Sequence, residues 1–138
     1  MITHVESEPI QDEVHLIRRL SGLPADTTVT LDARTARPLR ITAPDPGAQE
    51  ALGDVTMARA FGDRQASVST AFLGGFGPNV SIAHVGPELA AGDLTALLGA
   101  QFRGTPDGDK PVTYRFAWSQ RGKVPVGFVK DVAASDLA

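Results

Sequence analysis

His84 is the side chain best suited to acid–base chemistry among the three histidines of this chain. An unperturbed imidazole titrates closest to neutrality, so a general base would most simply be a histidine. His84 lies in the segment VSIAHVGPE, which is typical of a buried strand, and Glu88 follows just past its end. The pair could serve a small cavity enzyme or a small-molecule binder, with Arg59 or Arg115 as a further polar group. A lone strand histidine is, however, more often a core residue.

The remaining motifs exclude most catalytic and metal chemistry. The chain has no cysteine, which rules out thiolate metal sites, cysteine nucleophiles and a disulfide framework. No second or third ligand lies at metal spacing from a histidine, so we expect no metal site and no cofactor. The segment FLGGFGPN lacks the lysine and hydroxyl residue of a Walker loop, and no serine sits in a glycine-flanked nucleophile elbow. A motif-bearing enzyme is therefore not expected.

The densest cationic cluster lies in DARTARPLR and consists of Arg34, Arg37 and Arg40. Planar guanidinium groups suit a carboxylate or a phosphate, so the cluster is a candidate anion site. The alternative is a solvated connection in which Asp32 or Asp45 neutralises the arginines. We favour this second interpretation, because exposed basic clusters are usually just hydrated.

A stretch of 23 residues, from Gln65 to Pro87, contains no Asp, Glu, Lys or Arg. Its glycine and proline residues disfavour a membrane helix, and the pattern indicates two buried strands around a glycine-rich turn. Large apolar side chains beside such a turn need a surface to cover them, which can be the same chain or a partner. We predict a subunit or partner interface formed by four residues: Phe72, Leu73, Phe76 and Asn79.

The segment VTYRFAWSQRGKVPVGF, residues 112–128, holds the only tryptophan and the only tyrosine of the chain. Alternation predicts that four of its side chains share one face of a strand: Val112, Tyr114, Phe116 and Trp118. On a face packed against the rest of the chain, such a ladder is core. The alternative is a sheet-based RNA binder with exposed aromatic residues, but the basic and glycine signature of those proteins is only fragmentary here.

Apolar periodicity predicts two main helices. The first covers about residues 8–21 and is indicated by four apolar residues at helical spacing: Ile10, Val14, Ile17 and Leu20. The second follows Asp93 as its N-cap and has Gly104 at its far end, or it is a longer helix that starts at Pro87. It is indicated by the same spacing of Leu94, Leu97, Leu98 and Phe102.

Alternating apolar residues predict about seven strands, mostly in hairpins. A first hairpin would join residues 29–31 to residues 39–41. A meander would join VTMARAF and QASVSTAFL, around Gly62 and Asp63, to a third strand, NVSIAHV. A last hairpin would join residues 112–118 to 124–128.

These elements predict one α+β domain over residues 1–138, with an antiparallel or mixed sheet and the two helices packed on it. Residues 1–6 and 131–138 have little to pack against and are expected as loose tails. The N-terminus does not resemble a secretory signal, and no segment reads as a transmembrane helix. We therefore expect the protein in the cytoplasm, or in an assembly formed there.

The function expected from these observations is non-catalytic protein binding. The chain would bind a protein partner or itself, as a subunit of a larger assembly or as a small inhibitor or accessory protein. The formal net charge of −3 argues against nucleic acid, and no membrane partner is expected. The alternatives are the cavity enzyme with His84 and Glu88, and the RNA binder. A deep polar pocket around His84 would favour the enzyme, and an uncovered apolar patch would favour the binding protein.

Overall fold

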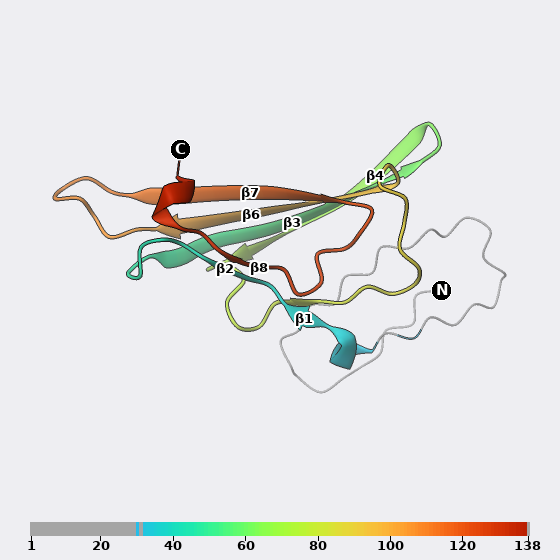
Figure 1. Cartoon of the computed structure of the whole chain (residues 1–138), viewed down its shortest axis with the longest axis horizontal. Coiled ribbons are helices and arrows are strands. Elements are labelled where there is room, and N and C mark those ends of the chain that lie inside the picture. The colour runs from blue at the N-terminus through green and yellow to red at the C-terminus, as the bar shows by residue number, and fades with distance from the viewer. Residues whose placement is uncertain (1–29, 31, 138) are drawn as a thin grey trace.

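A four-stranded antiparallel sheet forms the centre of the computed structural model, which describes residue 30 and residues 32–137. The strand order is β4-β3-β6-β7, so β3 and β6 are central while β4 and β7 are the two edges (Figure 1). The strand bounds are Gln49–Phe61 for β3, Arg64–Leu73 for β4, Leu94–Arg103 for β6 and Thr113–Arg121 for β7.

Short strands at the beginning, middle and end of the described chain cover one face of this sheet. β1 (Arg37–Pro38) pairs antiparallel with β5 (Ser81–Ile82), and β2 (Arg40–Thr42) pairs parallel with β8 (Val129–Asp131). Figure 1 shows β1, β2 and β8 together on one side of the long strands. The cover is therefore assembled from segments that are far apart in the sequence.

The hydrophobic core lies between the sheet and this cover. The central strand β6 contributes five alternate residues, all buried: Leu94, Ala96, Leu98, Ala100 and Phe102. The neighbouring strand β3 contributes Val55 and Met57, and the cover contributes Leu39 and Ile41. Burial of this apolar surface is what holds the short strands against the sheet.

The predicted α+β class is wrong for the described residues. Their only helical elements are two 3-10 turns, η1 (Ala33–Thr35) and η2 (Ala134–Asp136), and the rest of their regular structure is strand. The helix predicted over residues 8–21 lies outside the described residues. No helix in the described part of the chain is long and apolar enough to cross a membrane.

The second predicted helix, residues 94–102, is strand β6. The apolar residues of this segment fit both a period of 3.6 and a period of 2, and a short apolar run cannot separate the two. Tertiary packing selects the strand, because the sheet and its cover bury the alternating set from Leu94 to Phe102. Leu97, which the helical pattern would bury, is 45% exposed on the opposite face.

Two predicted strand pairings are also wrong. Residues 40–42 form β2, which pairs with β8, whereas residues 29 and 31 of the predicted first hairpin lie outside the described residues. The third strand of the meander shortens to β5, which pairs with β1 instead of β4. Residues 124–128 form no strand, because the chain turns after β7 and reaches β2 as β8. Each wrong pairing joined neighbours in the sequence, whereas the structure pairs distant segments.

Two predictions are confirmed. The β3–β4 hairpin closes through Gly62 and Asp63, and Gly62 has the positive φ of 63° that a type II′ turn requires at its first central position. The aromatic ladder of β7 faces the core, with the rings of Phe116 and Trp118 5.8 Å apart and those of Trp118 and Phe128 5.6 Å apart. The turn residues predicted the hairpin from local sequence, and strict alternation predicted the aromatic face.

Asp45 ties the turn before β3 to the turn between β6 and β7. Its carboxylate accepts hydrogen bonds from the backbone N–H of Thr105 at 2.6 Å and from that of Gly47 at 2.8 Å. The hydrogen bond from Thr105, followed by that from Gly47, holds the pKa of Asp45 below its ordinary value, because both favour the ionised form. The ionised carboxylate therefore helps to join the two turns at this end of the sheet.

The predicted C-terminal tail, residues 131–138, is attached to the domain at its start. The Thr42 hydroxyl donates a hydrogen bond of 2.7 Å to Asp131, and the N–H of Val132 donates to the Thr42 carbonyl at 3.1 Å. Val132 is also buried, so residues 131 and 132 belong to the packed domain and the exposed tail begins after them. The other predicted tail, residues 1–6, lies outside the described residues.

Candidate functional site

The face of the sheet that points away from the core carries small and polar side chains. We call it the open face, and define it by twelve alternate residues of the four strands: Ser67, Ser69, Ala71, Asp54, Thr56, Ala58, Leu97, Gly99, Gln101, Arg115, Ala117 and Ser119. None of these residues is buried, so no described segment packs over this face. Antiparallel sheets commonly pack one face and leave the other in contact with water.

Side chains on the open face interact across neighbouring strands. The hydroxyl groups of Thr56 and Ser69 are hydrogen-bonded at 2.6 Å. The carboxyl group of Asp54 lies directly over Gly99, where a Cβ would overlap it. A glycine at this position of β6 therefore lets Asp54 lie along the sheet, which keeps the open face shallow.

A hollow of about 500 Å³ crosses the open face between β3, β6 and β7. Its lining includes Gly99 and Ala117 together with the polar side chains of Asp54, Gln101 and Arg115. No ion pair joins Asp54 to Arg115, and no group of three His, Asp or Glu in residues 32–137 could hold a metal ion. The hollow offers polar contacts, but none of its lining residues is a histidine that could act as a base.

Strand β4 forms an exposed edge of the sheet. Eight of its ten residues are exposed, and Val68 and Leu73 are 47% and 91% exposed. No charged residue occurs from Gln65 to Leu73. Within the described fold, β4 has a strand partner on its β3 side alone. Its other side therefore presents backbone groups that no described strand uses.

The direction of these backbone groups follows from the pairing with β3. Residues of an antiparallel strand alternately bond to one neighbour and point away from it. The N–H of Gly74, next to the end of β4, donates to the carbonyl of Ala51 at 3.0 Å. The backbone N–H and C=O groups of the even-numbered residues of β4 therefore point toward β3. The N–H and C=O of the odd-numbered residues point outward: Gln65, Ser67, Ser69, Ala71 and Leu73.

Opposite charges lie at the two ends of β4. Arg64 begins the strand, beside the hairpin turn. At the other end, Glu50 of β3 accepts a hydrogen bond of 2.9 Å from the N–H of Gly77 and lies against Gly75. Glu50 is paired with the buried Phe102 and Arg64 is an even-numbered residue of β4, so both side chains lie on the core side of the sheet.

The predicted interface residues lie in different environments. Phe76 is only 2% exposed, since its ring covers Gly53 and lies 5.6 Å from the ring of half-buried Phe72. Phe76 therefore belongs to the core of this chain and is not accessible to a partner. Leu73 and Asn79 are exposed. The interface stays a prediction, with Leu73 as its accessible apolar side chain.

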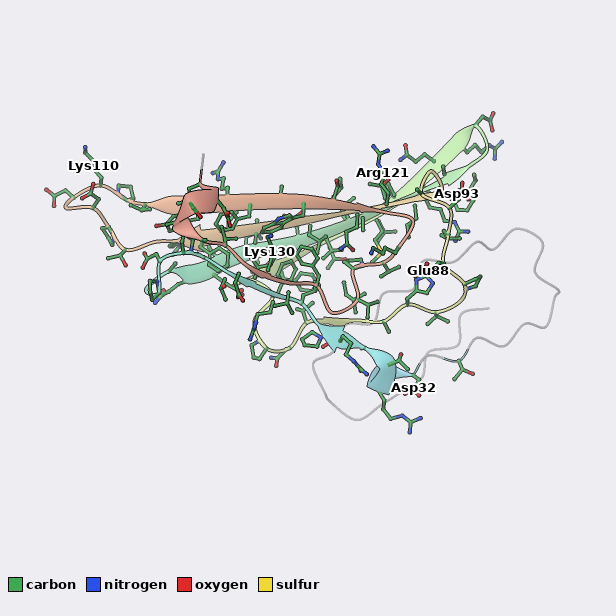
Figure 2. All side chains as sticks on the ribbon, viewed as in Figure 1. Asp32, Glu88, Asp93, Lys110, Arg121 and Lys130 are labelled. Carbon is green, nitrogen blue, oxygen red and sulfur yellow. The ribbon has the colours of Figure 1, made fainter. Side chains whose placement is uncertain are left out.

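The predicted catalytic groups do not converge. Nε2 of His84 lies 3.0 Å from the backbone oxygen of Pro87, and no hydrogen bond or ion pair joins His84 to Glu88. Figure 2 shows Glu88 on the connection between β5 and β6, to one side of the sheet. Arg59 points to the core side and Arg115 to the open face. Neither His84 nor Glu88 lines the hollow.

The predicted anion cluster is partly neutralised by the chain itself. The guanidinium of Arg34 donates two hydrogen bonds of 2.8 Å to Asp32, which lies beside η1 in Figure 2. This contact lowers the pKa of Asp32 and raises that of Arg34. Arg37 donates to two nearby backbone carbonyls, and Arg40 is exposed on β2. Anion binding here stays a prediction, although one of the three arginines already has a carboxylate partner.

The RNA-binding alternative depends on aromatic side chains displayed on an exposed sheet face. Tyr114, Phe116 and Trp118 of β7 instead pack against the core of the chain. The open face, as defined by its twelve residues, includes no aromatic side chain. The observation that suggested base stacking therefore has a structural explanation in the core.

Comparisons with known proteins leave the function to be argued from the chain itself. No protein-family model, no curated protein and no solved structure matches this chain.

The sequence reasoning missed the β4 edge as a site. The signal is present in QASVSTAFL, where small or polar residues fill both alternations over the first half of the segment. A central strand buried between a core and two neighbours would carry more apolar residues on at least one alternation, as β6 does. Such a segment next to a tight hairpin turn is typical of an edge strand.

Proposed function

We propose that this protein binds another polypeptide along the free edge of β4 and catalyses no reaction. The observation that carries the proposal is the row of outward backbone groups on a strand without charge from Gln65 to Leu73. Folded proteins usually protect free edges with charged side chains, proline, bulges or a covering segment. In the described structure β4 has none of these from Gln65 to Leu73, which supports a role for the edge in binding.

A partner would bind by adding a strand to the sheet. Its backbone would pair with the five outward residues of β4, and main-chain hydrogen bonds of this kind supply affinity. Ser67, Ser69 and Ala71 are small, so side chains of the added strand would meet little obstruction on the open face. Val68 and Leu73 are exposed and would supply apolar contacts.

The small-molecule alternative has less support. The hollow is spread across the open face, and the predicted catalytic pair, His84 and Glu88, lies outside it. A ligand site would normally enclose most of its ligand. We further propose that the chain and its partner form their assembly in the cytoplasm.

Matched lysine substitutions at the two sheet edges test the proposed function. Ser67 on β4 and Ser119 on β7 are both exposed, outward-facing serines on the open face. Ser67→Lys should weaken any complex of the chain by at least about tenfold, because a lysine on an edge strand discourages pairing with an added strand. Ser119→Lys should leave its affinity unchanged.

Hydrogen exchange on the complex supplies an independent readout. The complex is first identified by comparing the mass of the purified chain in solution with its mass after recovery from extract. Amides of the odd-numbered residues of β4 should exchange slowly in the complex and rapidly in the free chain. A complex that tolerates Ser67→Lys and leaves those amides unprotected would contradict the proposed function.

A further inference from the structure

We propose that the polypeptide bound by β4 is the β4 strand of a second copy of this chain. Two copies would pair antiparallel about a two-fold axis through Ser69 and form one continuous eight-stranded sheet. The inference rests on the proposed function of the β4 edge and adds the identity of the partner. An antiparallel contact between identical strands is self-complementary, as a two-fold interface requires.

The number of backbone pairs favours an axis at Ser69. The outward residues of β4 run from Gln65 to Leu73, and Ser69 is their midpoint. With the axis there, all five residues face outward residues of the second copy, which gives about ten hydrogen bonds. Shifting the axis by one residue leaves four such pairs. Ten hydrogen bonds is also about the number found in a typical protein interface.

The side chains on the open face are compatible with this register. Ser69 would face Ser69 of the second copy, and Ser67 would face Ala71. These side chains are exposed, small and uncharged, so the pairing brings no like charges together between Gln65 and Leu73. On the core side, exposed Val68 would lie opposite Thr70 of the second copy and diagonally from its Phe72, and would lose contact with water.

The charges at the ends of β4 select the same register. With the axis at Ser69, Arg64 lies opposite Gly74 of the second copy, one strand spacing of about 4.8 Å away. The Glu50 side chain of that copy lies against the adjacent Gly75, on the same side of the sheet as Arg64. Each end would thus bring a guanidinium near a carboxylate. Shifting the axis to Val68 would place Arg64 opposite apolar Phe72 instead.

The oligomeric state of the full chain is the first test. Light scattering should give about twice the chain mass of 14.5 kDa, and Ser67→Lys should return it to the mass of one chain. Ser119→Lys, the matched control, should keep the dimer. Arg64→Glu should weaken dimerisation by about tenfold, because it replaces two attractive contacts with repulsive ones.

Cysteine cross-linking tests the register separately, since the chain has no cysteine of its own. Ser69→Cys should form a disulfide-linked dimer on mild oxidation, because the two Cα atoms at the axis would be about 5.5 Å apart. Ser119→Cys, oxidised in the same way, should run as a monomer. Both variants are analysed by denaturing electrophoresis without a reducing agent.

Two results would overturn the second-copy inference. A chain that stays monomeric at all concentrations, yet binds a different protein through an edge sensitive to Ser67→Lys, would refute it and preserve the proposed function. A dimer that persists in Ser67→Lys, and that cross-links through Ser119→Cys but not through Ser69→Cys, would refute both the second-copy inference and the proposed function.

Discussion

The two edge strands of the sheet, β4 and β7, differ in the charged side chains that they carry. β4 and β7 each have one strand neighbour in the described structure and similar lengths of ten and nine residues. β7 carries Arg115 and Arg121 on the open face, and Figure 2 shows Arg121 at the end of the strand. β4 carries no charge over the corresponding stretch. Because charged side chains discourage edge-to-edge pairing, we infer that the β7 edge is protected and that the β4 edge, in the described structure, is open to pairing.

The two edges also differ in how they contribute to stability. β7 places Tyr114, Phe116 and Trp118 against the core, whereas the core side of β4 includes Val68, which is half exposed. Apolar area removed from water is the main stabilising contribution to folding. We infer that β7 is an edge required for the fold and that β4 is an edge more open to substitution.

The largest expected effect is a loss of stability on truncating an aromatic side chain of β7, compared with a small loss on β4. Trp118→Ala should lower the free energy of unfolding by about 3 kcal/mol, the lower end for a large aromatic side chain because Trp118 is half-buried. Val68→Ala should lower it by less than about 1 kcal/mol, since this side chain is 47% exposed. Urea unfolding measures both. Equal losses for the two variants would remove the distinction between the edges.

A second prediction concerns the loop that covers the core beside β4. A Cβ at Gly53 would lie 2.9 to 3.0 Å from three atoms of the Phe76 ring. Gly53→Ala should therefore destabilise the fold by about 1 to 3 kcal/mol through overpacking. Gly92→Ala is the control, because nothing lies within 4 Å of its added Cβ. If Gly53→Ala unfolds at the same thermal midpoint as the parent, the Phe76 ring moves aside without cost and the prediction is wrong.

Removing the charges of β7 should make the two edges alike. In the Ser67→Lys background, where β4 is blocked, Arg115→Ser with Arg121→Ser should raise self-association by up to about thirtyfold, since exposed charges contribute up to about 1 kcal/mol each. Sedimentation velocity at several protein concentrations measures the effect. If the triple variant remains as monomeric as its Ser67→Lys parent, charge is not what protects the β7 edge.

The smallest expected effect lies at the turn that supports β7. Because hydrogen bonds from Thr105 and Gly47 lower the pKa of Asp45 in the folded state, its stabilising contribution is present above its unfolded pKa. That contribution is lost as the pH falls through the folded pKa. Asp45→Asn should therefore be slightly less stable than the parent at neutral pH, and the difference should shrink below about pH 4. Paired urea titrations across this range would contradict the assignment if the difference did not change with pH.

The sequence predicted local features better than the identity of the site. The β3–β4 hairpin followed from Gly62 and Asp63, and the aromatic face of β7 followed from strict alternation. The same reasoning placed Phe76 at an interface because it could not show that the loop folds back over Gly53. It also joined His84 to Glu88, which the structure does not bring into contact.

The sequence by itself determined the properties that depend on residue types and near neighbours. The absence of thiol chemistry is compositional, and the hairpin turn depends on the backbone freedom of Gly62. Both can be read without knowing what surrounds them, because covalent geometry and short-range sterics decide them.

Tertiary structure alone decided which surfaces are buried and which are free. Residues 94–102 satisfy a helical and a strand pattern, and burial between the sheet and the β2–β8 cover selected the strand. The same packing buried Phe76 and left the β4 edge exposed. These outcomes depend on free energies shared between segments far apart in the chain, so no local pattern contains them.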